Sequence, residues 1–295
     1  MNVKRILILG LDAVEYDLVE EWDLKNLKQK EYGKTTLPIY AGEEPNTRII
    51  WPCFICGCMP KDMGYVTSKV FPKPIQYFAN TFSPIIKSTF NPQSDMPEDI
   101  TVRQENVKLK AIMKFYEIFK KLNMARNPKR EDIKASTMFD DDPRRISLHI
   151  PVYNEWLPDI AFKTIEAIED KTYRSIFNIN LLNEFKNKSN EVFNWLDKKD
   201  KWDLFMNYFW FLDGVQHVYF NNPKKIAKYY IMADEFIKKL NDRLDDDTML
   251  LIVSDHGQKK GIHTTHGFYS VNKKLGLKNP KLIDFRKTIE ELLQK

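Results

Sequence analysis

Histidine is rare in this chain of 295 residues, and most of it lies in one stretch. Four of the five histidines occupy the fifty residues from 217 to 266. They are His217, His256, His263 and His266. Asp213 precedes His217 by four residues, and Asp255 directly precedes His256. A lone histidine is more often a surface or core residue than a ligand. Imidazole mixed with carboxylate, however, suits zinc, manganese or iron better than calcium, so this cluster predicts a transition-metal site.

A second chemical feature is the hydroxyl of Thr47, which stands just before an apolar stretch that could be a helix. Threonine at such a position usually caps the helix, and residue type alone favours that interpretation. The alternative is a nucleophile, because the free N–H groups of a helix N-terminus suit a phosphate oxygen and a nearby metal lowers the pKa of a hydroxyl. Arg48, the next residue, would then either contact a phosphate oxygen or face solvent.

The three cysteines, Cys53, Cys56 and Cys58, lie within six residues of one another. An odd and tightly bunched number does not form a disulfide framework. Cys-x2-Cys is half a zinc knuckle, but the chain has no further cysteine to complete four thiolates. Because the spacing places Cys53 and Cys56 on one helix face, we expect them to be small buried residues.

Apolar runs indicate the elements that would position these side chains. Strands are expected at Arg5–Leu9, Thr35–Leu37, Ile146–Val152, Leu204–Leu212, Met249–Val253 and Phe268–Val271. Helices are expected at Asp17–Leu27, Lys163–Lys171, Ile176–Leu196, Lys224–Leu244 and Asp284–Leu293. Such alternation predicts an α/β fold with a mostly parallel central sheet flanked by helices. Sites in such sheets lie beyond the carboxyl ends of the strands, where Asp12, Asp213 and Asp255 are expected.

The middle of the chain differs from its two ends. Five prolines between residues 66 and 104 exclude a long helix or a central strand there, although Asn106–Leu122 has helical spacing. We therefore expect an insertion over 66–145 that caps the site and selects the substrate. The catalytic core would comprise 1–65 and 146–295.

Composition limits the class of protein. The 46 Lys and Arg against 41 Asp and Glu give a net charge of +5, which does not by itself predict a nucleic-acid binder and is compatible with a small anionic substrate. No apolar run reaches the about 18 residues that a membrane span needs, and Ile6–Leu11 is too short for a signal-peptide core. We expect a cytoplasmic protein without a membrane partner; the oligomeric state is not predicted.

Four segments together resemble the alkaline phosphatase superfamily, in its type I phosphodiesterase/nucleotide pyrophosphatase branch. They read ILILGLDAVEYDLV, TRIIWPCFICGCMPKDMGY, WFLDGVQH and IVSDHG, and cover residues 1–65 and about 200–270. The combination is specific, whereas each segment alone would be weak. The sequence departs from the family pattern at three places near the nucleophile, with Ile49 for a proline, Cys56-Gly57 for Thr-Gly and Met63-Gly64 for His-Gly. These changes concern helix packing and the substrate pocket, not the ligands.

The resemblance implies an alkaline phosphatase-like fold and a centre of two divalent ions, zinc or else manganese or iron. One ion would be held by Asp213, His217 and His263, the other by Asp12, Asp255, His256 and the Thr47 oxygen. For the last ligand the resemblance favours His263 over His266. Thr47 would be the catalytic nucleophile, forming a phosphothreonine, and Arg48 would bind substrate. The implied reaction is hydrolysis of a phosphodiester or nucleotide pyrophosphate bond; the alternatives are a phosphomonoesterase, a phosphomutase or a non-catalytic metal-binding homologue.

Overall fold

The computed structural model describes residues 3–64, 129–155 and 159–294. The chain divides into two compact units, one formed by residues 1–64 with 129–295 and the other by residues 65–128. Everything below concerns the first unit. The expected helix at Asn106–Leu122 and the proline-rich stretch before it lie outside the described residues, and their role as a cap stays a prediction.

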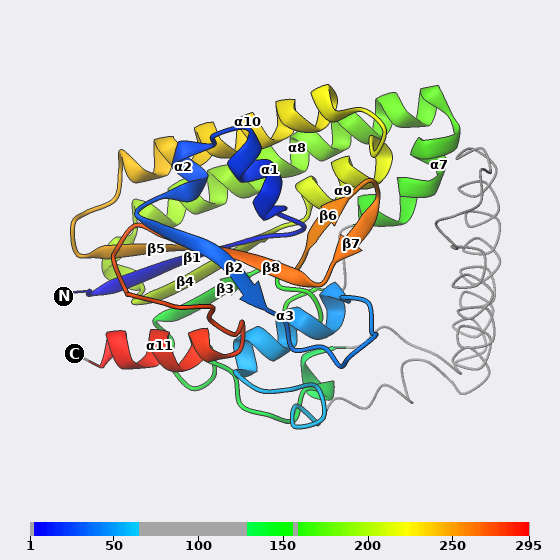
Figure 1. The fold of residues 1–295 in the computed structure, drawn as a ribbon. Helices are drawn as coiled ribbons and strands as arrows, with labels where there is room; N and C mark the ends of the chain where they lie inside the picture. Colours follow the sequence, from blue (N-terminus) through cyan, green and yellow to red (C-terminus); the bar gives the residue numbers. More distant parts are fainter. Residues whose placement is uncertain (1–2, 65–128, 156–158, 295) are drawn as a thin grey trace. The chain divides into compact units, whose positions relative to one another are not determined.

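The described unit is built on a six-stranded sheet with the strand order β2-β8-β5-β1-β4-β3 (Figure 1). The strands are β1 (Arg5–Leu11), β2 (Glu31–Thr36), β3 (Arg145–Leu148), β4 (Leu204–Phe209), β5 (Thr248–Ser254) and β8 (His266–Val271). The four strands β5, β1, β4 and β3 are parallel, while β8 runs antiparallel to both β5 and β2. A separate two-stranded hairpin follows β5, formed by β6 (Gly257–Lys259) and β7 (Ile262–Thr264). The predicted fold class is therefore confirmed.

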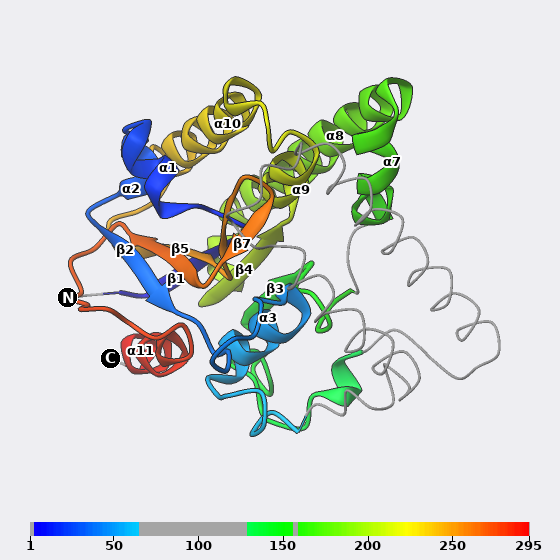
Figure 2. The same ribbon diagram turned by 45° about the vertical axis from the view of Figure 1, so that its right-hand side comes forward.

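Helices cover both faces of the sheet, as Figures 1 and 2 show, with α8 and α10 on one side and α3 and α11 on the other. The helices are α1 (Tyr16–Glu21), α2 (Lys25–Lys28), α3 (Thr47–Cys56), α7 (Thr164–Glu169), α8 (Lys171–Leu196), α9 (Phe211–Val218), α10 (Pro223–Asn241) and α11 (Asp284–Leu293). Short 3-10 turns occur at Arg130–Asp132, Asp159–Lys163 and Lys199–Lys201. Because both faces are covered, the residues of β4 and β5 are buried throughout, which explains their unbroken apolar runs.

Several expected elements differ from the structure. The strand expected at Ile146–Val152 covers only Arg145–Leu148, and the strand expected at Thr35–Leu37 covers Glu31–Thr36. The helix expected at Asp17–Leu27 is broken into α1 and α2, because Asp23 between them adopts a positive φ of 46°. The strand expected at Leu204–Leu212 ends at Phe209, and α9 begins at Phe211. Asp213 therefore lies in the first turn of a helix and not at a strand end.

The insertion was expected over residues 66–145, and the second unit begins at residue 65. The end of the expected insertion, residues 129–145, belongs to the described unit and packs on it. The Lys134 N–H donates to the Met63 carbonyl at 3.0 Å, and the Met138 N–H donates to the Ile55 carbonyl at 2.9 Å. Residues 129–145 thus lead along the end of α3 into β3.

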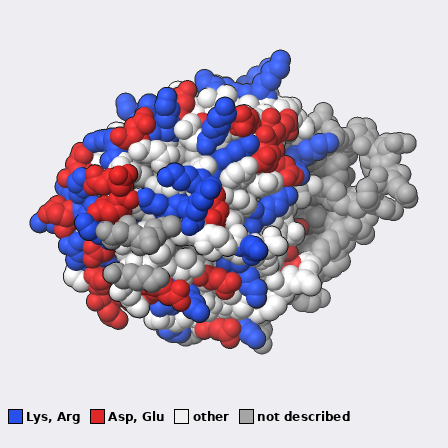
Figure 3. Space-filling view, turned by 60° about the vertical axis from the view of Figure 1, so that its left-hand side comes forward, with Lys and Arg blue, Asp and Glu red and all other residues white. Residues whose placement is uncertain are grey.

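Positive and negative side chains are interspersed over the described residues on the face shown in Figure 3. This mixing agrees with the small net charge of +5. Within residues 3–64, 129–155 and 159–294, none of the helices has the length and apolar character needed to cross a membrane.

Candidate metal centre

Asp12 follows β1 directly, and hydrogen bonds from its loop to the ends of β4 and β5 fix its position. Its backbone N–H donates to the Phe209 carbonyl at 2.9 Å, which prolongs the pairing between β1 and β4. The chain then turns at Ala13, whose φ is 58°, and the Val14 N–H donates to Ser254 Oγ at 2.8 Å. The side chain of Asp12 is thereby placed at the carboxyl edge of the sheet, between β4 and β5.

Asp255 and His256 extend from the end of the neighbouring strand, β5. Ser254 Oγ donates to the His256 carbonyl at 2.8 Å and so tightens the turn that follows the strand. His256 Nε2 lies 3.3 Å from Asp12 Oδ1 and 3.5 Å from Asp255 Oδ2. The potential ligand atoms of these three buried side chains all lie within 4.8 Å of one another. Two adjacent parallel strands thus bring one imidazole and two carboxylates together.

Thr47 joins this first group from α3. Asn46 caps the helix, with its Oδ1 accepting the Arg48 N–H at 3.0 Å, so the expectation that Thr47 is the N-cap was wrong. The Thr47 hydroxyl instead lies 3.4 Å from Asp12 Oδ2 and 3.3 Å from His256 Nε2. Since Asn46 caps the helix, the Thr47 hydroxyl does not cap it and contacts Asp12 and His256 instead.

Arg48 is half-buried, and its Nε donates to Asn46 Oδ1 at 3.3 Å. Its side chain therefore folds back onto the residue that caps α3. Substrate binding by Arg48 stays a prediction.

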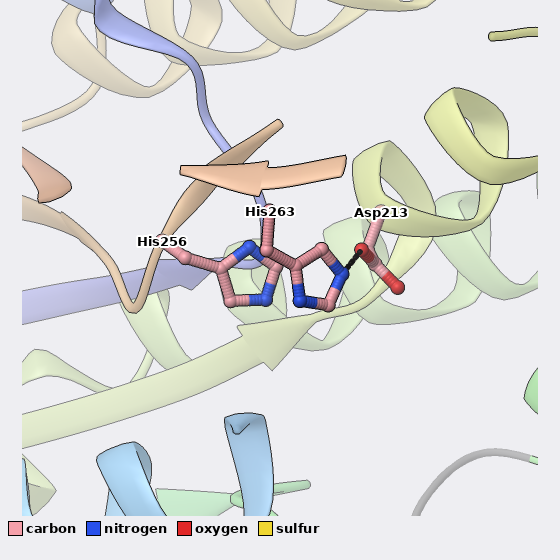
Figure 4. A group of neighbouring side chains, drawn as sticks. All are labelled: Asp213, His256 and His263. Atoms are coloured by element: carbon pink, nitrogen blue, oxygen red, sulfur yellow. Dashed lines mark ion pairs between the residues drawn. The ribbon is translucent and has the colours of Figure 1, made fainter. Parts of the chain in front are cut away.

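A second group of potential ligands comprises Asp213, His256 and His263, which converge in Figure 4. Asp213 Oδ1 lies 3.7 Å from His263 Nε2 and 3.3 Å from Nε2 of His217, one turn further along α9. The two imidazoles of His217 and His263 approach to 3.1 Å between their Nε2 atoms. The rings of His256 and His263 are stacked, with centroids 4.0 Å apart. The two groups are therefore contiguous.

The carboxylates of both groups have oxygens without hydrogen-bond partners among the described residues. These buried atoms are Oδ1 of Asp12, Oδ1 of Asp213 and both oxygens of Asp255. Leaving a buried carboxylate oxygen without a donor is costly, and a bound cation would remove that cost. The mixed nitrogen and oxygen donors suit zinc, manganese or iron. The residues present therefore fit a divalent metal.

The pKa values of these side chains reflect the crowding of charge. Burial raises the pKa of Asp12 well above its ordinary value, and the nearby carboxylates of Asp255 and Asp213 raise it further. Burial also raises the pKa of Asp255, to about 7. Burial alone would raise the pKa of Asp213, but the neighbouring imidazoles of His217, His263 and His256 together outweigh burial and lower it. Burial together with His256 lowers the pKa of His263 to about 3. Without a cation, Asp12 and Asp255 are thus driven toward their neutral forms.

The two groups differ in their access to solvent. The side chains of Asp12, Asp255 and His256 are fully buried, whereas those of His217 and His263 are 30% and 27% exposed. Among the described residues, the centre is therefore more exposed at His217 and His263 than at Asp12, Asp255 and His256.

His266 is directed to a different partner. Its Nε2 lies 3.2 Å from Oε1 of Glu15, whose other oxygen accepts the Thr264 hydroxyl at 3.0 Å. Of the two histidines considered for the last ligand, the geometry brings His263 to the group and places His266 on Glu15. The assignment of the last ligand to His263 stays a prediction.

Two side chains at the centre were missed from sequence. Tyr208 of β4 belonged to an aromatic run interpreted as core, yet its hydroxyl donates to Asp12 Oδ2. A buried tyrosine needs a partner for its hydroxyl, and that requirement was the available signal. Gln258 of β6 lies with its Nε2 3.0 Å from His217 Nδ1. It belongs to a hairpin of three-residue strands, too short to leave a clear periodicity.

Cys53 and Cys56 are buried in α3, as expected. Burial raises the pKa of the Cys56 thiol to about 12, so it stays protonated. In the part of the chain that the structure describes, neither residue belongs to a group of three or more potential metal ligands.

Comparison with known proteins relates this geometry to a family. The sequence matches the family described as type I phosphodiesterase / nucleotide pyrophosphatase over residues 6–288. It is also similar to two proteins named GPI ethanolamine phosphate transferase 3. The protein from Saccharomyces cerevisiae is 29% identical over 131 residues, covering 39% of this chain and 12% of that protein. The protein from Eremothecium gossypii is 32% identical over 60 residues, covering 20% of this chain and 6% of that protein. The chain thus matches a small fraction of the length of these relatives.

Among solved structures, the PH0037 protein from Pyrococcus horikoshii is similar, with a TM-score of 0.48 and 14% sequence identity. That similarity covers 100% of this chain and 98% of the other.

Proposed function

The chain belongs to the type I phosphodiesterase / nucleotide pyrophosphatase family, and we propose that it hydrolyses a phosphodiester or nucleotide pyrophosphate bond through a phosphothreonine on Thr47. Family membership supports phosphoester chemistry. The observation that carries the finer proposal is the position of the Thr47 hydroxyl, 3.4 Å from Asp12 Oδ2 and 3.3 Å from His256 Nε2. A hydroxyl between potential metal ligands at a helix N-terminus is suited to attack phosphorus.

Two divalent ions, zinc or else manganese or iron, would be held by the two groups of ligands. Asp213, His217 and His263 would hold one, and Asp12, Asp255, His256 and the Thr47 oxygen the other. When bound, these ions would neutralise the carboxylates and stabilise the charge that develops on the attacking and leaving oxygens.

The chain's own residues account for the geometry of the reaction. The Thr47 oxygen would form a bond to phosphorus while the bond to the leaving oxygen breaks, and water would then cleave the phosphothreonine. The Tyr208 hydroxyl, bonded to Asp12 Oδ2, holds that carboxylate beside Thr47. The leaving group would depart on the side of His217 and His263, where the centre is exposed.

The test is a panel of phosphate monoesters and diesters supplied to zinc- or manganese-loaded protein. We expect turnover of at least one ester, and acid quenching followed by mass spectrometry should find phosphate on the peptide that contains Thr47. Thr47→Ser, which keeps a hydroxyl, is the matched control for Thr47→Ala. Near wild-type turnover by Thr47→Ala would contradict the proposal.

A second candidate reaction is transfer of the phosphoryl group to an alcohol. The similarity to proteins named GPI ethanolamine phosphate transferase 3 supports it. In that case the phosphoryl group on Thr47 would keep one ester substituent of the donor, and an acceptor alcohol, and not water, would attack its phosphorus, breaking the bond to Thr47 and giving a new diester. Adding a primary alcohol to the assay and identifying products by mass spectrometry separates the two reactions.

A further inference from the structure

The side chain of Gln258 is buried against one of the histidines of the centre. Its residue is 1% exposed, and its Nε2 lies 3.0 Å from His217 Nδ1. The other end of the carboxamide, Oε1, is buried without a hydrogen-bond partner among the described residues. The nitrogen that faces His217 Nδ1 and the unpartnered oxygen are thus the two ends of one carboxamide.

The chemistry of a metal-bound imidazole requires the opposite orientation of this carboxamide. Nε2 of His217 faces Asp213 Oδ1 at 3.3 Å, so Nε2 is the nitrogen that would bind a metal. Nδ1 then carries the ring proton and is a donor, as is the NH2 end of a carboxamide. A half-turn about the Cγ–Cδ bond of Gln258 exchanges its two ends and brings the unpartnered Oε1 onto Nδ1.

We propose that Gln258 is a positioning residue, whose Oε1 accepts the Nδ1–H of His217 and thereby directs the Nε2 lone pair to the metal shared with Asp213 and His263. This inference rests on the proposed function. Acceptors of this kind fix the tautomer and the orientation of a ligating ring and strengthen metal binding.

The pairing of the hairpin supports this role. Gln258 of β6 lies directly opposite His263 of β7, so a single hairpin carries one ligand and the group that orients another. The hairpin is itself held in place, because the Thr264 hydroxyl donates to Glu15 at 3.0 Å. A Cβ at Gly257 would overlap the Glu15 carboxylate and the Thr264 hydroxyl, so the hairpin packs closely against this anchor.

The test is titration of metal-depleted protein with zinc chloride in competition with a chromophoric chelator. Gln258→Met keeps the length of the side chain and removes the acceptor, while Gln258→Glu keeps an acceptor. We expect Gln258→Met to weaken one of two zinc sites by about 10–100-fold and to leave the other unchanged. Gln258→Glu should bind zinc as wild type does, and saturating zinc should restore turnover to Gln258→Met.

A matched control is Gln29→Met. Gln29 also donates through Nε2, to Ser270 Oγ at 2.9 Å, and also has a buried Oε1 without a partner among the described residues. Since this hydrogen bond joins Gln29 to no residue of the centre, the Gln29→Met protein should bind zinc with the affinity of wild type. Equal weakening in Gln29→Met, or no rescue by Gln258→Glu, would show a packing effect and overturn the proposal.

The wild-type protein gives an independent measurement. In zinc-loaded protein with 15N-labelled histidine, NMR should show His217 bound through Nε2 and protonated at Nδ1; binding through Nδ1 would overturn the role of Gln258. Two zinc sites of unchanged affinity in Gln258→Met would overturn it while the proposed function stands. Wild-type protein that binds neither zinc, manganese nor iron would refute the proposed function, and this inference with it.

Discussion

Replacing Asp255 with asparagine should stabilise the metal-free protein at pH 8. The Asp255 carboxylate is fully buried, and neither oxygen has a hydrogen-bond partner among the described residues. Burial raises its pKa to about 7, against about 3.9 in an unfolded chain. A carboxyl group whose pKa is raised in the folded state contributes stability below the unfolded value, and that contribution is lost as pH rises through about 7.

The magnitude follows from the size of the shift. Each pH unit between the two pKa values is worth about 1.4 kcal/mol. Between pH 5 and pH 8 the wild-type protein should therefore lose about 2–3 kcal/mol of stability at Asp255. Asparagine has nearly the same shape and is neutral throughout, so Asp255→Asn escapes this loss. Its advantage over wild type should grow by the same amount between the two pH values.

The assay is urea unfolding of both proteins at pH 5 and pH 8, first in EDTA and then with zinc. Zinc at 100 times its Kd stabilises a protein by about 2.7 kcal/mol, and Asp255→Asn should lose most of that gain with its ligand. The difference in the free energy of unfolding between Asp255→Asn and wild type, measured in EDTA, should therefore become smaller when zinc is added. If Asp255→Asn is less stable than wild type in EDTA at pH 8, the carboxylate is satisfied by the protein itself and the reasoning is refuted.

A matched control is Asp234→Asn. The Asp234 carboxylate accepts hydrogen bonds from the Asn26 and Leu27 backbone N–H groups at 2.9 and 2.8 Å. Since those donors lose a charged acceptor, this substitution should destabilise the protein with or without zinc.

Four further outcomes are expected. Thr47→Ala should fold with nearly unchanged stability, since Asn46 caps α3, while kcat falls by orders of magnitude in the ester assay. Tyr208→Phe removes the donor to Asp12 and should cost about 1–3 kcal/mol in urea unfolding, together with weaker zinc binding in the chelator titration. Cys56→Ser should leave the zinc content from elemental analysis unchanged; loss of one equivalent would revive the zinc-knuckle hypothesis. A chromogenic diester should be cleaved faster than the matching monoester, because a monoanionic diester needs less positive charge around its free oxygens. A monoester preference that collapses in Arg48→Ala would contradict that expectation.

The position of the centre could be predicted from sequence where strands determine it. Asp12 and Asp255 each follow a continuous apolar run, and adjacent parallel strands end at the same edge of a sheet. Asp213 was expected at a strand end for the same reason and is in a helix, because the aromatic run through Phe209 and Phe211 continues across the boundary. A short apolar run does not distinguish a strand from a buried helix.

The partners of the ligands could not be predicted in the same way. Tyr208 and Asp12 are 196 residues apart, and Gln258 reaches His217 only because a hairpin folds back from the end of β5. Such pairs depend on tertiary geometry and leave no local pattern. The role of Thr47 was ambiguous in the sequence, because a cap and a nucleophile both suit the start of a helix; in the structure the adjacent Asn46 is the cap, since its side chain accepts the Arg48 N–H.

His256 belongs to both groups of potential ligands, and its contacts indicate which group it serves. Its Nε2 lies 3.3 Å from Asp12 Oδ1 and 3.3 Å from the Thr47 hydroxyl, and these partners have no second imidazole nearby in the described contacts. Asp213 already has two imidazoles, with Nε2 of His217 at 3.3 Å and Nε2 of His263 at 3.7 Å. Under the proposed function, assigning His256 to Asp12 and Asp255 would give each ion three carboxylate or imidazole ligands, with the Thr47 oxygen as a further ligand of the buried ion. The buried group would then adjoin Thr47, the proposed nucleophile, and the more exposed group would lie where we propose that the leaving group departs.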